Sequence, residues 1–220
     1  VQCLDDYGIP LLLNHTIVDI KGKDRIEGVT IAEVDEDRKP IGGSLQYYEC
    51  DTLLLSVGLI PENELSKGIG VKLDPITGGP VVNESMETTV KGIFACGNVV
   101  HVHDLVDYVT EESRKAGRNA ARFVKGKAEE YGRMISTKSG NGIRYIVPHF
   151  IRQDKVEHSV DLFMRVDRIF TNKKLVVRTG NIVIRIIKKA YMRPGEMERI
   201  IITAESLKTA DNLSLTVDVE

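Results

Sequence analysis

Residues 88–99 read TTVKGIFACGNV, and this stretch decides the fold that we expect. Its apolar run at residues 93–96, IFAC, is short and typical of a buried strand. Gly97 follows, and because it has no Cβ it lets a backbone approach another group closely. Asn98 then offers an amide oxygen and an amide NH2 at the carboxyl end of the strand, where open α/β sheets bind their ligands. The stretch therefore predicts a strand, a turn and a ligand contact.

Two further segments flank this stretch. Residues 50–61, CDTLLLSVGLIP, form an apolar run that Gly58 interrupts and Pro61 closes, which predicts a second buried strand. Residues 104–125, DLVDYVTEESRKAGRNAARFVK, begin acidic and end basic, as the macrodipole of a helix favours. Two buried strands and a long helix predict an α/β arrangement.

The wording and spacing of the two strand segments resemble the two-dinucleotide flavoproteins of the pyridine-nucleotide-disulfide oxidoreductase type. That group includes thioredoxin reductase, nitrite reductase large subunits and the α subunits of amino-acid dehydrogenases of the hydroxyproline or sarcosine type. In the family, the first segment leaves the NAD domain and re-enters the FAD domain, and the second carries an acidic residue that binds a ribityl hydroxyl. The resemblance covers residues 1–126. It implies an FAD-dependent, NAD(P)-linked oxidoreductase in which hydride passes between nicotinamide and flavin.

The resemblance also implies five cofactor-binding residues. Gly58 corresponds to the junction of the two nucleotide domains, and Gly97 lies beside the ribityl-phosphate. Asn98 stands where the family usually has Asp, although its amide can still accept from a hydroxyl. The backbone near Asp104 and Leu105 belongs to the amino end of a helix that points at the flavin pyrimidine ring. No residue is identified as a catalytic acid or base.

The phosphate cradle of a dinucleotide site is absent from the sequence. Such a cradle needs a strand, a G-x-G-x-x-G turn and a helix start, and no such run occurs. The chain also begins at Val1, without Met. We therefore expect the carboxyl-terminal piece of a longer flavoprotein, which by itself binds no FAD stably and is inactive.

The pattern changes from mixed to a period of two near Gly142. Up to residue 126 we expect the incomplete NAD(P)/FAD-binding segment, then a linker over residues 127–138, and an all-β sandwich domain over residues 139–220, of immunoglobulin-like topology. Short β-branched runs support the last assignment. Alternation within these runs selects ten inward side chains: Phe150, Leu162, Met164, Val176, Ile184, Ile186, Ile200, Ile202, Leu215 and Val217.

Composition indicates a cytoplasmic globular protein. The net charge is -2 and the pI about 6.3, so no basic excess points to nucleic acid. Apolar runs are shorter than the roughly 18 to 20 residues that a membrane span needs, and no signal-peptide pattern opens the chain. Cys3, Cys50 and Cys96 lack C-x-x-C spacing, which indicates a reducing compartment and argues against a redox dithiol.

Some polar residues invite a metal or redox interpretation. His101 and His103 lie in the sequence HVHD, but their spacing gives no closed ligand set, so we expect capping and packing rather than a metal site. Glu112 lies with Asp107 and Glu111 on what should be a solvated helix face. Cys96 should act as a small hydrophobic residue.

A second function, of a different class, stays open. In this alternative the β-rich part is an interaction module that docks a partner electron-transfer subunit, with nothing catalytic bound to this chain. A flavin absorbance spectrum of the purified chain distinguishes the two functions. The sequence leaves open the electron acceptor, the choice between NADH and NADPH, and the oligomeric state.

Overall fold

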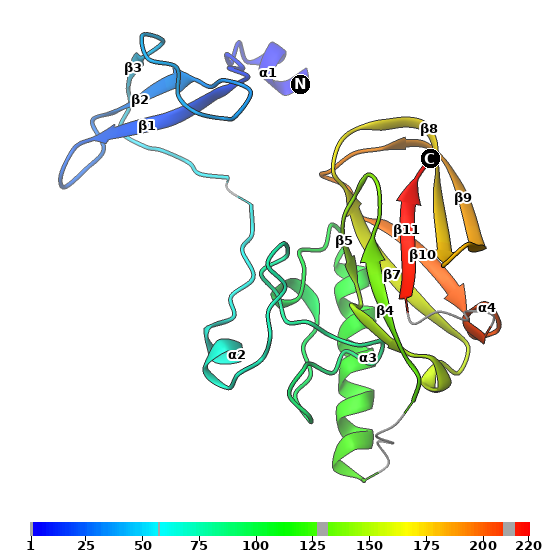
Figure 1. Ribbon diagram of the computed structural model, residues 1–220. Helices are drawn as coiled ribbons and strands as arrows, with labels where there is room; N and C mark the ends of the chain where they lie inside the picture. The colour runs from blue at the N-terminus through cyan, green and yellow to red at the C-terminus, as the bar shows by residue number, and fades with distance from the viewer. Residues whose placement is uncertain (1, 57, 127–131, 209–213) are drawn as a thin grey trace. The chain divides into compact units, whose positions relative to one another are not determined.

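The computed structural model describes residues 2–56, 58–126, 132–208 and 214–220 (Figure 1). The chain divides into two compact units, Val1–Gly58 and Leu59–Glu220. Most regular structure in both units is strand, with few helices. Within the described part of the chain, no helix is both long enough and apolar enough to cross a membrane.

The first unit is a three-stranded antiparallel sheet preceded by a short helix. The elements are α1 (Gln2–Asp6), β1 (His15–Lys21), β2 (Gly28–Glu33) and β3 (Gln46–Glu49), with strand order β1-β2-β3. Val29 and Ala32 on β2 are buried, whereas Ile20 on β1 and Tyr47 on β3 stay about half exposed, at 50% and 52%. The sheet therefore has little core of its own among the described residues.

The second unit opens with turns rather than strands. It contains α2 (Glu64–Gly68) and the 3-10 turn η1 (Gly97–Val99). The chain between these two elements forms isolated β-bridges such as Glu87↔Phe94. The buried strands expected at residues 50–61 and 93–96 do not form among the described residues, so that expectation is wrong. In the first segment Leu54 and Ile60 are 89% and 86% exposed, and in the second, backbone bonds to residues 86–88 form only an isolated bridge, Glu87↔Phe94.

The long helix is confirmed. Helix α3 (Val106–Val124) begins two residues after the expected start and carries Asp107 in its first turn and Arg122 in its last, which suits the macrodipole. Its buried side chains include Ala116, which packs against the rest of the unit. Leu105 is the N-cap and makes no side-chain capping hydrogen bond.

From residue 134 onward most of the described chain is strand. The elements are β4 (Met134–Ser139), β5 (Ile143–Val147), β6 (Phe150–Arg152), η2 (Gln153–Lys155), β7 (Ser159–Val166), β8 (Phe170–Thr179), β9 (Ile182–Met192), β10 (Glu198–Thr203), α4 (Ala204–Lys208) and β11 (Ser214–Val219). They form a three-stranded sheet, β10-β7-β5, and a five-stranded sheet, β6-β4-β11-β8-β9. The pairing of β11 with β4 is parallel, and the other pairings are antiparallel.

Both sheets contribute to one hydrophobic core. Seven of the ten side chains expected to point inward are buried, Phe150 is half-buried, and Ile184 is half-buried against the core. Ile186 is 54% exposed, so its assignment is wrong. Ile184 has no partner in the pairing of β8 with β9, so β9 has a bulge there. Because the bulge adds one residue, the side chains after it that face the core shift by one position, and Ile187 packs on the core instead of Ile186.

The boundary expected at residues 127–138 also differs from the structure. Residues 127–131 lie outside the described part of the chain, but β4 begins at Met134 and lies between β6 and β11. A second core cluster joins Val82, Met86 and Val100 to Tyr145 and Val147 of β5. Residues 59–126 and the following strands therefore share one unit, whereas the separation by contacts falls after Gly58.

Candidate functional site

The turn at Gly97 is fixed by a buried carboxylate. Gly97 has φ +71°, a backbone conformation that side chains other than glycine rarely adopt. Its N–H donates to Glu112 Oε2 at 2.8 Å. A Cβ at this position would stand 3.1 Å from Val109 Cγ1, so glycine also lets the turn pack closely against α3. Glycine at residue 97 therefore allows a close approach to the helix, and its place beside the ribityl-phosphate stays a prediction.

Asparagine side chains hold the two ends of the turn. Asn98 is exposed, and its Oδ1 accepts the backbone N–H of His103 at 3.2 Å. Asn63 is 4% exposed and donates from Nδ2 to Val99 O at 2.8 Å and to Gly78 O at 3.0 Å. Asn63 is not among the residues predicted from the sequence, although it lies two residues after Pro61, at the end of the first motif. It connects the two recognised segments.

Strands from the β-rich part bind the chain just before α3. The carboxylate of Asp104 accepts from the N–H of Met197 at 2.6 Å and from the Arg165 guanidinium. Arg165 also donates to Val102 O at 3.0 Å and to the Tyr145 hydroxyl at 3.2 Å. Burial alone would lower the pKa of Arg165, but the hydrogen bond to Asp104 outweighs it and raises the pKa.

The positions of Asp104 and Leu105 refine the expected helix contact. The free N–H groups of a helix belong to its first turn, which starts here at Val106. The side chain of Asp104 is engaged by Arg165 and Met197, and Leu105 is 52% exposed. Gly58 is exposed and ends the first unit, and a Cβ added there would meet no heavy atom within 4 Å. Its role at a domain junction stays a prediction.

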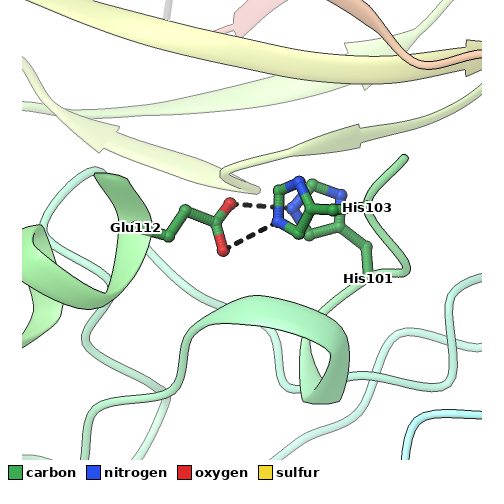
Figure 2. A group of neighbouring side chains, drawn as sticks. All are labelled: His101, His103 and Glu112. Carbon is green, nitrogen blue, oxygen red and sulfur yellow. Dashed lines mark hydrogen bonds and ion pairs between the residues drawn. The ribbon is translucent and has the colours of Figure 1, made fainter. Parts of the chain in front are cut away.

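His101, His103 and Glu112 meet behind the turn (Figure 2). His101 Nε2 lies 2.8 Å from Glu112 Oε1, and His103 Nε2 lies 3.1 Å from Glu112 Oε2. The three residues are 1%, 8% and 4% exposed. Glu112 was expected on a solvated face, and that expectation is wrong; Asp107 and Glu111 on the same helix are exposed.

The electrostatics of this cluster follow from its burial and its hydrogen bonds. Burial alone would raise the pKa of Glu112, but the hydrogen bond with His101 and the close contact with the His103 ring outweigh it and lower the pKa to about 2. Burial lowers the pKa of His101, although Glu112 opposes this. Glu112 is therefore an ionised carboxylate inside the protein, held by Gly97 and His101.

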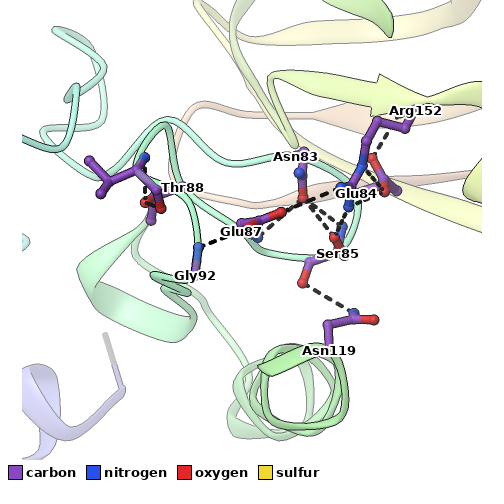
Figure 3. A network of polar contacts seen from close by, with 9 residues as sticks. Asn83, Glu84, Ser85, Glu87, Thr88, Gly92, Asn119 and Arg152 are labelled. Carbon is purple, nitrogen blue, oxygen red and sulfur yellow. Dashed lines mark hydrogen bonds and ion pairs between the residues drawn. The ribbon is translucent and has the colours of Figure 1, made fainter. Parts of the chain in front are cut away.

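A polar network ties the preceding loop to β6 and α3 (Figure 3). Arg152 donates from its backbone N to Glu84 Oε2 at 2.8 Å and from Nε to Glu84 Oε1 at 2.9 Å. Asn119 on α3 donates from Nδ2 to Ser85 O at 3.1 Å. These bonds hold the loop that leads into the turn from both sides. Cys96, which was expected to be a small hydrophobic residue, packs against the second core cluster.

Comparison with known proteins identifies a family and several relatives. The model of the pyridine nucleotide-disulphide oxidoreductase family matches residues 2–120. An NADH oxidase of Methanocaldococcus jannaschii is 29% identical over 124 residues, which are 56% of this chain and 24% of that protein. A CoA-dependent NAD(P)H sulfur oxidoreductase of Pyrococcus furiosus is 27% identical over 133 residues, 58% of this chain and 27% of that protein.

A third relative extends the match. The NAD(P)H nitrite reductase of Bacillus subtilis is 25% identical over 185 residues, 82% of this chain and 21% of that protein, so the similarity continues into the β-rich part. Among solved structures, a thioredoxin reductase from Gloeobacter violaceus aligns with 54% of this chain and 36% of its own, at 17% identity and a TM-score of 0.29. The chain spans about a quarter of the length of the three curated relatives.

Proposed function

The chain belongs to the pyridine nucleotide-disulphide oxidoreductase family, and we propose from this that it works in an FAD-dependent, NAD(P)-linked oxidoreductase. The relatives are named as NAD(P)H-dependent oxidoreductases, which supports a general redox role. Within the family, we place the chain in the branch of the hydroxyproline or sarcosine dehydrogenase α subunits. The layout of a nucleotide-binding segment followed by a β sandwich is part of the same proposal.

The start of α3 carries the proposal. Its N-cap residue, Leu105, supplies no side-chain acceptor, so among the described residues no N-cap side chain occupies the first-turn N–H groups, which can therefore bind a ligand. Leu105 and Val106 next to them are 52% and 74% exposed. A helix start with free donors and exposed apolar side chains suits a flat, partly apolar group that develops negative charge, such as the flavin pyrimidine ring.

The residues around this helix start have distinct roles in the proposal. Glu112 and Asn63 hold the turn, which fixes where Asn98 is exposed. Because Asn98 Oδ1 is used by His103 N, its amide NH2 is the group that we assign to a ribityl hydroxyl. When bound, FAD supplies the hydride chemistry with nicotinamide, and the chain supplies orientation and electrostatics. We expect this chain alone to hold FAD weakly, because its sequence has no G-x-G-x-x-G turn.

Substitution of Asn98 tests the proposal in the FAD-loaded enzyme. Asn98→Leu removes both amide groups, a loss of roughly 1 to 3 kcal/mol, so FAD affinity should fall about tenfold or more. Asn98→Asp restores the acidic residue usual in the family, keeps an acceptor for His103 N, and should retain FAD. Both affinities are measured by flavin fluorescence titration. Equal affinity in the Leu variant and the parent contradicts an FAD role for the turn.

The second function, docking of a partner electron-transfer subunit, is favoured by β9. This strand lies at the edge of the five-stranded sheet, where backbone groups are free to pair with another chain. Ile182, Val183 and Ile186 on it are 46%, 43% and 54% exposed. The same titration distinguishes the two functions. If the folded chain has no measurable FAD affinity, and the larger enzyme that contains it has none either, docking is favoured.

A further inference from the structure

The cluster of His101, His103 and Glu112 has a use beyond holding the turn. Two imidazoles and one carboxylate come from different segments, the chain after η1 and the second turn of α3, and converge in a buried space (Figure 2). One donor atom from each lies within 4.8 Å of the others. We propose that these three side chains bind a divalent first-row transition-metal ion.

Several ring nitrogens of the cluster lack a hydrogen-bond partner in the described part of the chain. His101 Nδ1 and both ring nitrogens of His103 are buried and have no hydrogen-bond partner among the described residues. His103 Nε2 lies 3.1 Å from Glu112 Oε2, yet the pair lacks hydrogen-bond geometry. Buried polar groups normally find partners, because leaving them unpaired is costly. Two donor atoms that are close but do not bond to each other are the arrangement expected around a shared cation.

The distances fit a metal ion. Zn²⁺ holds imidazole nitrogen and carboxylate oxygen at about 2.0–2.2 Å, so two ligand atoms at a tetrahedral angle are roughly 3.3 Å apart. The two nitrogen-to-oxygen distances to Glu112, 2.8 Å and 3.1 Å, are only a few tenths of an ångström shorter. All three ligand atoms lie within 4.8 Å of one another, so one ion can reach all of them after rotation of the side chains.

The cluster also holds a buried negative charge. Glu112 is a carboxylate on a buried helix face, and its ion-pair partners among the described residues are the two histidines, with no Lys or Arg. A buried charge needs compensation, and a divalent cation provides it directly. The rings of Tyr108, Tyr145 and Phe163 lie 5.6–6.3 Å from the imidazole rings and line the site with apolar surface. That surface limits exchange with water.

The donor set decides the class of metal. Two imidazoles and one carboxylate suit Zn²⁺, Fe²⁺, Co²⁺ or Ni²⁺, whereas Ca²⁺ and Mg²⁺ prefer oxygen ligands alone. Three protein ligands leave at least one coordination position for water or another small ligand. The site lies beside the turn that we assign to FAD, but it requires no flavin, so it goes beyond that function.

Cobalt titration of the chelator-treated 220-residue chain tests the proposal. We expect one Co²⁺ per chain, seen as visible d–d absorption and as heat in calorimetry, with Zn²⁺ displacing it. Metal should also raise the melting temperature, because it binds only the folded state. A folded parent chain that takes up neither Co²⁺ nor Zn²⁺ overturns the proposal, and it leaves the FAD assignment untouched because no step uses flavin.

Matched variants locate the ion. His103→Leu removes a ligand whose ring makes no hydrogen bond in the structure, so it should keep the fold and lose metal affinity by at least about tenfold, equivalent to 1.4 kcal/mol. Glu112→Gln keeps an acceptor oxygen for Gly97 N, places an amide NH2 opposite His101 Nε2 and removes the charge, with the same expected loss of metal affinity. His158→Leu, on an exposed residue outside the cluster, is the control and should bind as the parent does. Unchanged affinity in either ligand variant assigns the metal elsewhere and contradicts the site.

Discussion

The two units of the chain use similar strands for different ends. In Val1–Gly58 three strands pair in sequence order, yet among its described residues only Val29 and Ala32 are buried apolar side chains. In Leu59–Glu220 two sheets share a core, and a second cluster joins them to the turn and α3. Strand pairing alone gives a sheet, whereas packing between elements gives a fixed arrangement of polar groups. The candidate site accordingly lies in the second unit.

The polar groups differ in the same way. In the first unit, the ion pair between Arg25 and Asp51 involves side chains that are more than 70% exposed. In the second unit, Glu112, Glu84 and Glu198 are buried, and each has a charged or imidazole partner. Exposed pairs contribute little to stability, whereas breaking buried pairs is costly. Substitutions in the two units should therefore have unequal effects.

The largest effect is expected from the core. Leu162 on β7 is 0% exposed, and Leu162→Ala should destabilise the second unit by about 2–5 kcal/mol. Ile20 on β1 is 50% exposed and faces Val29 across one strand pair, so Ile20→Ala should cost the first unit less than about 1 kcal/mol. Hydrogen exchange followed by mass spectrometry reports the opening free energy of each unit. Equal losses for the two variants would break the comparison.

The core could be predicted from the sequence because its signal is local. Leu162, Met164, Ile200 and Ile202 lie in alternating runs, and each run became a strand with that alternation intact. Ile186 failed because a bulge at Ile184 depends on how β9 pairs with β8, which the run itself does not contain. Periodicity therefore predicts where a strand lies and which of its side chains face the core, but only up to the next bulge in its pairing.

The site was less predictable, because its contacts join distant residues. Gly97 and the helix after it were recognised from their own stretches, but Glu112 reads as one acid among several on a charged helix. Only its position opposite His101 and the Gly97 N–H makes it buried. Asn63 was missed for the same reason, since its acceptor, Val99 O, lies in the other motif. Side-chain contacts across a fold leave no periodic signal in the sequence.

An intermediate effect is expected from pH. Burial alone would raise the pKa of Asp74, but the His149 ring, whose Nε2 lies 3.6 Å from Oδ2, and hydrogen bonds from the N–H groups of Thr77 and Ile76 outweigh it and lower the pKa from 3.8 to about 2. A depressed pKa stabilises the fold above the unfolded value, and that stabilisation is lost as pH falls from about 5 towards 2. Because Asp74 is partly solvated, we expect about 1–2 kcal/mol.

The matched variant is Asp74→Asn, which keeps an acceptor for Ile76 N and Thr77 N but cannot ionise. In this variant the opening free energy of the second unit should fall less between about pH 5 and about pH 2 than in the parent. Hydrogen exchange, corrected for intrinsic exchange rates, measures this free energy. The first unit has no buried carboxylate among its described residues, so its opening free energy should change less over the same range. If Asp74→Asn and the parent lose the same opening free energy at low pH, the pH dependence comes from other groups.

The smallest effect separates backbone strain from packing. Gly97 and Gly43 both have positive φ, +71° and +94°, and Ala at either position should cost about 1 kcal/mol in strain. A Cβ at Gly97 also meets Val109 Cγ1 at 3.1 Å, whereas the position at Gly43 is open. Gly97→Ala should therefore cost the second unit a few tenths of a kcal/mol more than Gly43→Ala costs the first. Hydrogen exchange in α3 is the measurement, because a displaced turn would also weaken the Gly97 N–H bond to Glu112. If the two variants cost the same and exchange in α3 is unchanged, the turn is held by its own backbone, and its packing against the helix contributes nothing measurable.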